Sequence, residues 1–288
     1  MSRIRSRSGS LLLGLLGLYL FVYPWGILLI ALDRVPVWGT WMGGALLILQ
    51  GTMMGVWLAA NYGRRGALSA LLILLIGWAV EYIGVTTGFP FGGYQYTGVL
   101  WPEIADAVPL AIPFAWLLVV PAAIGVTDRL LGARAGLPQP SPGGGLMLLP
   151  VAASFATLLD VTIEPVAVHI NGYWIWDSMS GYYGVPLSNF AAWWVTSLLL
   201  VAIVLWLRQA ALRINQQRGV APLLVWLPLL LYLLNLTMFV LVNLAHRQVA
   251  AAAIGTLILS YLAFDRVEPL LVRWVLGMEQ SDTQQGEA

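Results

Sequence analysis

Long apolar runs separated by short polar breaks constrain this chain more than any other feature of its sequence. Each run is close to the roughly 20 residues that an α-helix needs to cross about 30 Å of hydrocarbon. We predict about eight spanning helices, at 11–31, 40–60, 67–84, 109–128, 146–164, 188–208, 221–243 and 248–265. The sequence therefore predicts an all-α fold, a polytopic integral membrane helix bundle.

The charge content supports this fold. Only 9% of the 288 residues are charged and 60% are apolar, whereas a soluble domain carries about 25% charged residues. So few charges cannot cover a water-facing surface, so the outside of the bundle must face the lipid bilayer. The net charge of +1 argues against nucleic acid as a partner. We expect a single transmembrane domain at 1–275 and a polar C-terminal tail at 276–288.

The placement of arginine orients the predicted bundle. If the N-terminus is cytoplasmic, twelve of the fourteen basic residues fall on inner segments, and only Arg34 and Arg247 fall on outer ones. This asymmetry is the one that the positive-inside rule describes. The first apolar run is too long for a signal peptide and no small-residue cleavage site follows it, so we expect a membrane anchor. We predict a multi-pass protein of the cell (cytoplasmic) membrane with both termini in the cytoplasm.

The two longest outer loops, 85–108 and 165–187, hold no basic residue and are rich in glycine and aromatic residues. Aromatic residues gather at membrane interfaces in any case, and an interfacial belt is one interpretation. A Val-Pro-Leu triplet ends each loop, and a tryptophan follows it at the same spacing, Trp116 in one case and Trp193 in the other. We therefore predict a parallel repeat at about 67–131 and 146–208. Such a repeat would bring both loops to one end of the bundle, around one pocket.

Three carboxylates lie near the outer ends of the predicted helices: Glu81, Asp160 and Glu164. Acidic groups inside spanning helices usually face a cavity or a partner. Asp160 and Glu164 are four residues apart and share one helix face. We expect Pro165 to end that helix, so that like charge, burial and the helix dipole together favour a protonated form of at least one of the pair. A protonated acid in a dry aromatic pocket can protonate an alkene; the alternative is that the pair only hydrogen-bonds neighbouring helices.

Two segments resemble a known family. The stretch from Glu81 to Thr97, EYIGVTTGFPFGGYQYT, is similar to a signature of the membrane carotenoid hydratases, which include γ-carotene 1′-hydratases and bisanhydrobacterioruberin hydratases. A second stretch, from Asp160 to Phe190, is similar to the second signature of that family, and the resemblance is concentrated in about 81–116 and 157–194. It implies cofactor-free addition of water to the terminal C=C bond of a long polyene, which gives a tertiary alcohol. It also implies a lipophilic carotenoid as substrate and other enzymes of the carotenoid pathway as candidate partners.

The roles of individual residues follow from the chemistry rather than from the resemblance. Glu164 or Asp160 would protonate the alkene, and electron-rich rings would stabilise the tertiary cation through their faces. A water held by Glu81 or Asp177, with His169 or Asn189, would then add to the cation. The catalytic candidates are Glu81, Asp160, Glu164 and Asp177, and the substrate-binding candidates are Tyr94, Tyr96, His169, Trp174, Trp176, Asn189 and Trp193. The sequence has no cysteine and no metal or nucleotide motif, so we expect neither a metal nor a cofactor.

Two other functions remain open at this point. A carotenoid cyclase would use the same acid and the same cation, but would exclude water and let a second double bond of the substrate attack. A small-molecule or proton-coupled transporter would also hold buried carboxylates and repeated helices.

Overall fold

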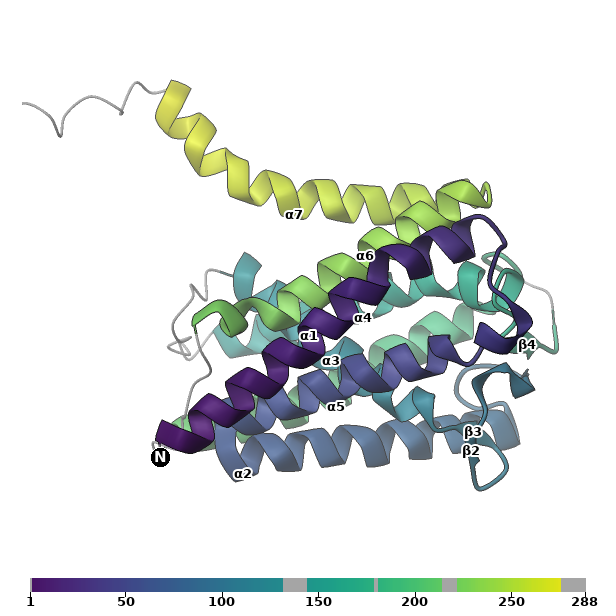
Figure 1. The fold of residues 1–288 in the computed structure, drawn as a ribbon, viewed down its shortest axis with the longest axis horizontal. Helices are drawn as coiled ribbons and strands as arrows, with labels where there is room; N and C mark the ends of the chain where they lie inside the picture. The colour runs from purple at the N-terminus through teal and green to yellow at the C-terminus, as the bar shows by residue number, and fades with distance from the viewer. Residues whose placement is uncertain (1, 132–143, 179–180, 214–221, 276–288) are drawn as a thin grey trace, which may run out of the picture.

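In the computed structural model, which describes residues 2–131, 144–178, 181–213 and 222–275, long helices run side by side and short strands gather at one end (Figure 1). The helices are α1 Ser2–Ala31, α2 Met42–Thr87, α3 Ala111–Leu130, α4 Gly144–His169, α5 Leu187–Arg213, α6 Leu227–Ala245 and α7 Val249–Val275. The strands are β1 Tyr94–Tyr96, β2 Glu103–Ile104, β3 Val108–Pro109 and β4 Trp174–Trp176, and three short 3₁₀ helices cover Val37–Gly39, Gly98–Leu100 and Pro222–Trp226. The predicted tail at 276–288 lies outside the described residues.

Six helical segments of the described chain are long and apolar enough to cross a membrane. The prediction of a polytopic helical membrane bundle is therefore confirmed. One of the six, Val37–Thr87, has 51 residues, more than twice the roughly 20 that one crossing needs. A seventh apolar segment, Val249–Phe264, is shorter than the others. The count of eight stays a prediction.

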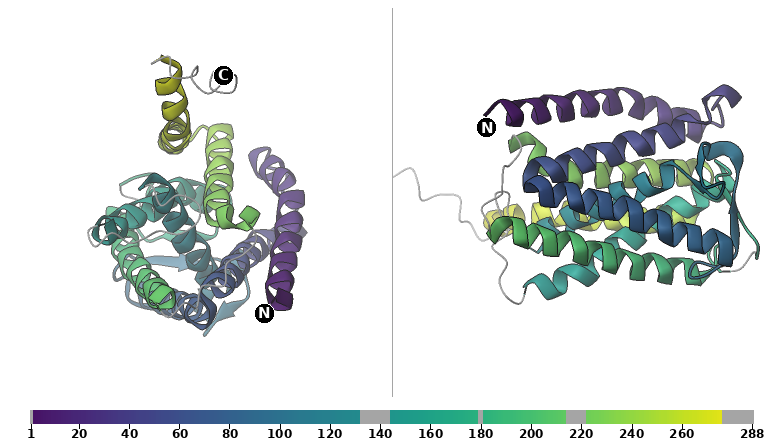
Figure 2. Two further views of the ribbon diagram at one scale, coloured as in Figure 1. Left: turned by 90° about the vertical axis from the view of Figure 1, so that its left-hand side faces the viewer. Right: turned by 90° about the horizontal axis from the view of Figure 1, so that it is seen from below.

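Helix α2 reverses direction at Gly63, whose φ of 60° and ψ of −138° are not helical. A Cβ built on Gly55 would lie 3.7 Å from the Cβ of Ala70, although fifteen residues of straight helix would separate them by about 22 Å. The two arms of α2, 42–62 and 64–87, are therefore antiparallel neighbours, as Figure 2 shows. A Cβ on Gly66 would lie 1.9 Å from the carbonyl oxygen of Leu58, so the tight turn requires glycine there. The two arms correspond to the predicted runs at 40–60 and 67–84.

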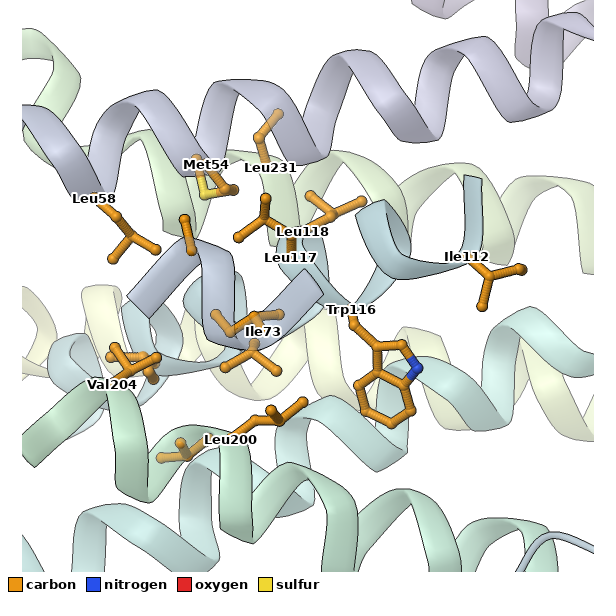
Figure 3. Close-up of a cluster of buried hydrophobic side chains, with 14 of the residues drawn as sticks. Met54, Leu58, Ile73, Ile112, Trp116, Leu117, Leu118, Leu200, Val204 and Leu231 are labelled. Carbon is orange, nitrogen blue, oxygen red and sulfur yellow. The ribbon is translucent and has the colours of Figure 1, made fainter. Parts of the chain in front are cut away.

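Helix α3 forms the centre of the bundle and α1 its outside. In the span of α3, 78% of the apolar window is buried inside the protein, against 11% for α1. The core around α3 interleaves side chains from α2, α3, α5 and α6 (Figure 3), among them Met54, Leu58, Ile73, Leu117, Leu118, Leu200, Val204 and Leu231. The large apolar side chains of α1 that are exposed, such as Phe21 and Trp25, suit a surface that faces lipid.

Short strands join the two aromatic loops, a feature that the sequence analysis did not predict. Strand β1 pairs with β4 in antiparallel register, with Tyr94 opposite Trp176 and Tyr96 opposite Trp174. The pairing places both loops at the same end of the bundle, as expected. Their backbone groups are thus satisfied by each other, which is what a segment close to hydrocarbon requires.

The prediction that Pro165 ends its helix is wrong, because α4 continues to His169. Proline removes one backbone N–H and usually kinks a helix, but helices of membrane bundles tolerate it where neighbouring groups bind the freed backbone. The carbonyl that this proline leaves without its helical donor is that of Val161, whereas the side-chain amide of Gln248 donates a hydrogen bond to the carbonyl of Pro165 itself at 3.1 Å. Glu164 therefore lies more than one turn inside the helix rather than at its end.

Candidate active site

A cavity lies beneath the paired strands and reaches from the inner helices to α1. Its empty space, including the open mouth, is about 1360 Å³, and side chains from α1 to α6 and from both aromatic loops line it. Glu81, Asp160 and Glu164 all line this cavity. The three residues are only 6%, 1% and 2% exposed. The structure thus brings the three carboxylates of the sequence analysis into one space.

Glu81, on the second arm of α2, accepts hydrogen bonds from three rings. The hydroxyls of Tyr94 and Tyr96 donate to its Oε2 at 2.6 and 2.7 Å. The indole N–H of Trp116, on α3, donates to its Oε1 at 3.0 Å. The two tyrosines reach the same atom because residues i and i+2 of a strand point to one face.

Glu164, on α4, is surrounded in a similar way by the other strand. The indole N–H groups of Trp174 and Trp176, at alternate positions of β4, donate to its Oε2 at 3.1 and 3.3 Å. The amide of Asn189, in the first turn of α5, donates to Glu164 Oε1 at 2.9 Å and to Asp160 Oδ2 at 3.1 Å. Asn189 therefore links the two carboxyl groups of α4.

The rings that bind the two glutamates pack against each other through the strand pairing. The ring centroids of Tyr94 and Trp176 are 5.1 Å apart. Trp116 of α3 and Trp193 of α5, which also line the cavity, stack with their ring centroids 4.1 Å apart. The tryptophans that follow the two Val-Pro-Leu triplets are thus in contact, although the limits of a repeat remain a prediction. Together these rings form an aromatic wall that donates hydrogen bonds to the carboxyl groups of both Glu81 and Glu164.

No arginine, lysine or histidine is among the described residues that line the cavity. No group of three or more potential metal ligands occurs anywhere in the described chain. The donors to the carboxylates are the uncharged O–H and N–H groups of tyrosine, tryptophan and asparagine. An acid in such surroundings can exchange a proton with a bound molecule, because it is not held in a salt bridge.

Two candidate residues do not reach the cavity. Asp177 follows Trp176 and is exposed; its backbone N–H donates to the Gly93 carbonyl at 2.9 Å. Its side chain points away from the wall because neighbouring residues of a strand face opposite sides. His169 is exposed at the end of α4, where Nε2 contacts the Tyr183 carbonyl at 2.8 Å. Neither residue lies beside the three carboxylates as the sequence analysis expected.

The remaining candidates line the cavity together with residues that the sequence analysis did not assign to the site. Tyr94, Tyr96, Trp174, Trp176, Asn189 and Trp193 are all in its wall. Further polar or aromatic members are Tyr19, Tyr23, Gln50, Phe91, Trp116, Asn171, Tyr173, Asn235 and Phe239. Trp116 was marked by the repeated spacing, and Gln50 and Asn235 are amides inside apolar runs. Nothing in the sequence indicated that the first helix takes part.

Comparison with known proteins bears on what this cavity does. Residues 42–262, well over half of the chain, match the sequence model of a family described as carotenoid biosynthesis protein. A bisanhydrobacterioruberin hydratase of Haloarcula japonica is 32% identical over 140 residues, which cover 49% of this chain and 45% of that protein. The match therefore spans less than half of the length of that relative. No solved structure matches the chain. The chain belongs to the carotenoid biosynthesis protein family.

Proposed function

We propose that the protein is a carotenoid hydratase, which adds water to the terminal C=C bond of a long polyene without a cofactor. The observation that carries the proposal is the set of three buried carboxyl groups, free of any cationic partner in the cavity, beneath a wall of aromatic rings. The family match and the hydratase from Haloarcula japonica support it.

Asp160 is the best proton donor of the three. Glu81 and Glu164 each accept three hydrogen bonds from side-chain groups, and both oxygens of each carboxyl are engaged. Asp160 accepts one, at Oδ2, and Oδ1 has no donor among the described residues. Donors stabilise the ionised form of a carboxyl, so a single proton shared by this cluster belongs on Asp160. Glu164 then acts as its neighbour in the pair, joined to it by Asn189.

The reaction follows from this arrangement. The proton of Asp160 adds to the less substituted carbon of the terminal double bond, and the π electrons form the new C–H bond. The tertiary cation that results lies beside the rings of Trp174 and Trp176, whose faces attract positive charge. A water oxygen forms the C–O bond, and the proton that it releases returns to a carboxylate of the cluster.

The test is co-expression of the gene in a host that makes lycopene, followed by mass analysis of the extracted polyenes. A hydratase gives products heavier by one or two water molecules, and the Asp160→Asn variant gives far less of them. A product with unchanged mass but a closed ring would establish a cyclase instead. Unchanged lycopene, with protein present in the membrane, would contradict both activities. Uptake of a solute by proteoliposomes would then point to a transporter.

A further inference from the structure

A pair of amide side chains forms a second polar site in the cavity wall, in addition to the three carboxyl groups. Gln50, on the first arm of α2, and Asn235, on α6, both line the cavity and are each only 4% exposed. The amide nitrogen of Asn235 donates to Gln50 Oε1 at 2.7 Å and to the Leu231 carbonyl at 2.8 Å. These two hydrogen bonds involve Nδ2 of Asn235 and Oε1 of Gln50, and they leave Oδ1 of Asn235 and Nε2 of Gln50 unused.

The other polar atom of each side chain, Gln50 Nε2 and Asn235 Oδ1, has no hydrogen-bond partner in the part of the chain that the structure describes. A polar group that faces a cavity without a partner is unfavourable, so the unpaired donor of Gln50 and the unpaired acceptor of Asn235, on two side chains in contact with each other, indicate a ligand. A donor and an acceptor side by side match an O–H group, which accepts one hydrogen bond and donates another.

The chemistry of the substrate limits what that ligand can be. A hydrocarbon polyene has no atom that could satisfy either amide group. Apolar side chains, Leu46, Leu47 and Met238, line the cavity one turn away from the pair, and the hydroxyl of Tyr23, which also lines it, already donates to the Leu234 carbonyl. The pair therefore does not recognise the polyene itself. An O–H group in this cavity comes from water, which is consumed, or from the tertiary alcohol, which is formed.

We propose that Gln50 and Asn235 bind the water molecule that adds to the cation. This inference rests on the proposed function and deepens it. Gln50 Nε2 donates to the water oxygen, and one water hydrogen is donated to Asn235 Oδ1. When the water oxygen forms its bond to the cationic carbon, the water gives up one proton to a carboxylate, and no oxidant or reductant takes part. The carboxyl cluster thus makes the cation, and the amide pair supplies the nucleophile.

Formation of the cation and addition of water to it are two steps that can be measured independently in heavy water. Protonation by a deuterated acid labels the carbon next to the cation, and loss of a proton from that cation returns a labelled alkene. In the Gln50→Met variant, we expect hydration to fall by roughly tenfold, the effect of losing about one hydrogen bond. Deuterium in the recovered polyene, relative to alcohol formed, should rise because the cation waits longer for water.

Asn243→Leu is the matched control. Asn243 lies two turns further along α6, is buried, and donates to the carbonyls of Thr162 and Phe239 at 2.9 and 2.8 Å, but it does not line the cavity. Its loss should lower protein yield and leave the ratio of exchange to hydration unchanged. Gln50→Asn, which keeps a shorter amide, should lie between Gln50→Met and the native protein in that ratio and covers the case in which the methionine variant does not fold.

The outcomes are distinguishable. If native protein forms no alcohol, the proposed function fails, and this inference fails with it. If native protein forms alcohol, but both Gln50 variants lose exchange and hydration in equal proportion, the amide pair supports folding or polyene binding and the water site is wrong. If the variants bind product more weakly with an unchanged exchange ratio, as shown by faster release of the alcohol from the protein, the ligand is the alcohol, which also overturns the water site.

Discussion

The three carboxyl groups of the cavity differ in how many hydrogen bonds they accept, and this difference predicts how substitutions rank. Asp160→Asn removes the proposed proton donor and should lower polyene turnover by about 10²–10⁴-fold, the usual worth of a positioned general acid. Glu164→Gln and Glu81→Gln should cause smaller losses, because each replaces a carboxylate that accepts from rings rather than the donor itself. Turnover per amount of membrane-inserted protein is the measurement.

Asp106→Asn is the control for these substitutions, since Asp106 is an exposed loop residue outside the cavity. It should retain full activity. If all three cavity variants keep more than about a tenth of native turnover, below the range for general acid catalysis, none of these groups is the acid.

In the proposed reaction the rings of β4 have two functions, because each donates a hydrogen bond to Glu164 and each would face the cation. Trp174→Leu and Trp176→Leu should each lower turnover by roughly three- to thirtyfold, since a desolvated cation–π contact contributes about 2 kcal/mol. Trp101, which is 75% exposed on the loop before α3, offers the comparison, and Trp101→Leu should be close to native. If both β4 variants show native turnover, the rings do not stabilise a cation and are interfacial aromatic residues only.

At the scale of elements, α1 forms a wall of the cavity that is held at two points. The Tyr23 hydroxyl donates to the Leu234 carbonyl at 2.7 Å, and His246 Nε2 lies 3.0 Å from the Ile30 carbonyl. Gly26 lies between these contacts, lines the cavity, and has open space where a Cβ would be. At Gly26 the wall formed by α1 therefore has no side chain and no packed neighbour.

A large side chain at this place should obstruct the cavity without disturbing a packed neighbour. We expect Gly26→Phe to lower turnover at least tenfold while the protein still inserts and purifies like the native form. Gly17→Phe is the control, because Gly17 also has open space around it but does not line the cavity. Equal activity of the two variants would show that the polyene does not pass beside α1.

The helices could be predicted from the sequence, whereas the elements that shape the site could not. Apolar runs of the right length mark spans in any chain, and the two arms of α2 appear as separate runs. Strands β1 and β4 have three residues each, and their register depends on a partner about 80 positions away. That register decides which rings meet Glu81 and Glu164. The opposite orientation of Asp177 follows from the same register, so its exclusion could not be predicted either.

For the whole molecule, the arginine asymmetry predicts an orientation that the fold makes easy to test. Reporter fusions after Arg65 and Gly145 should report the cytoplasm, and so should one after Arg218, which lies outside the described residues. Fusions within 95–105 and within 170–180 should report the other side of the membrane. Since β1 and β4 are paired, the two loops must give the same answer. Opposite answers from them would contradict the pairing itself.

The paired strands also bear on how a substrate arrives. They form a hydrogen-bonded cover over the end of the cavity, whereas the cavity wall at α1 belongs to a helix whose exposed side chains are apolar and suit contact with lipid. A hydrocarbon polyene that enters from that side never has to leave the bilayer. The concentration that governs its binding is then its mole fraction in the membrane. For the proposed activity, the rate should then follow polyene per lipid rather than polyene per volume of water. Dilution of the membranes into more buffer would leave it unchanged, and added lipid would slow it.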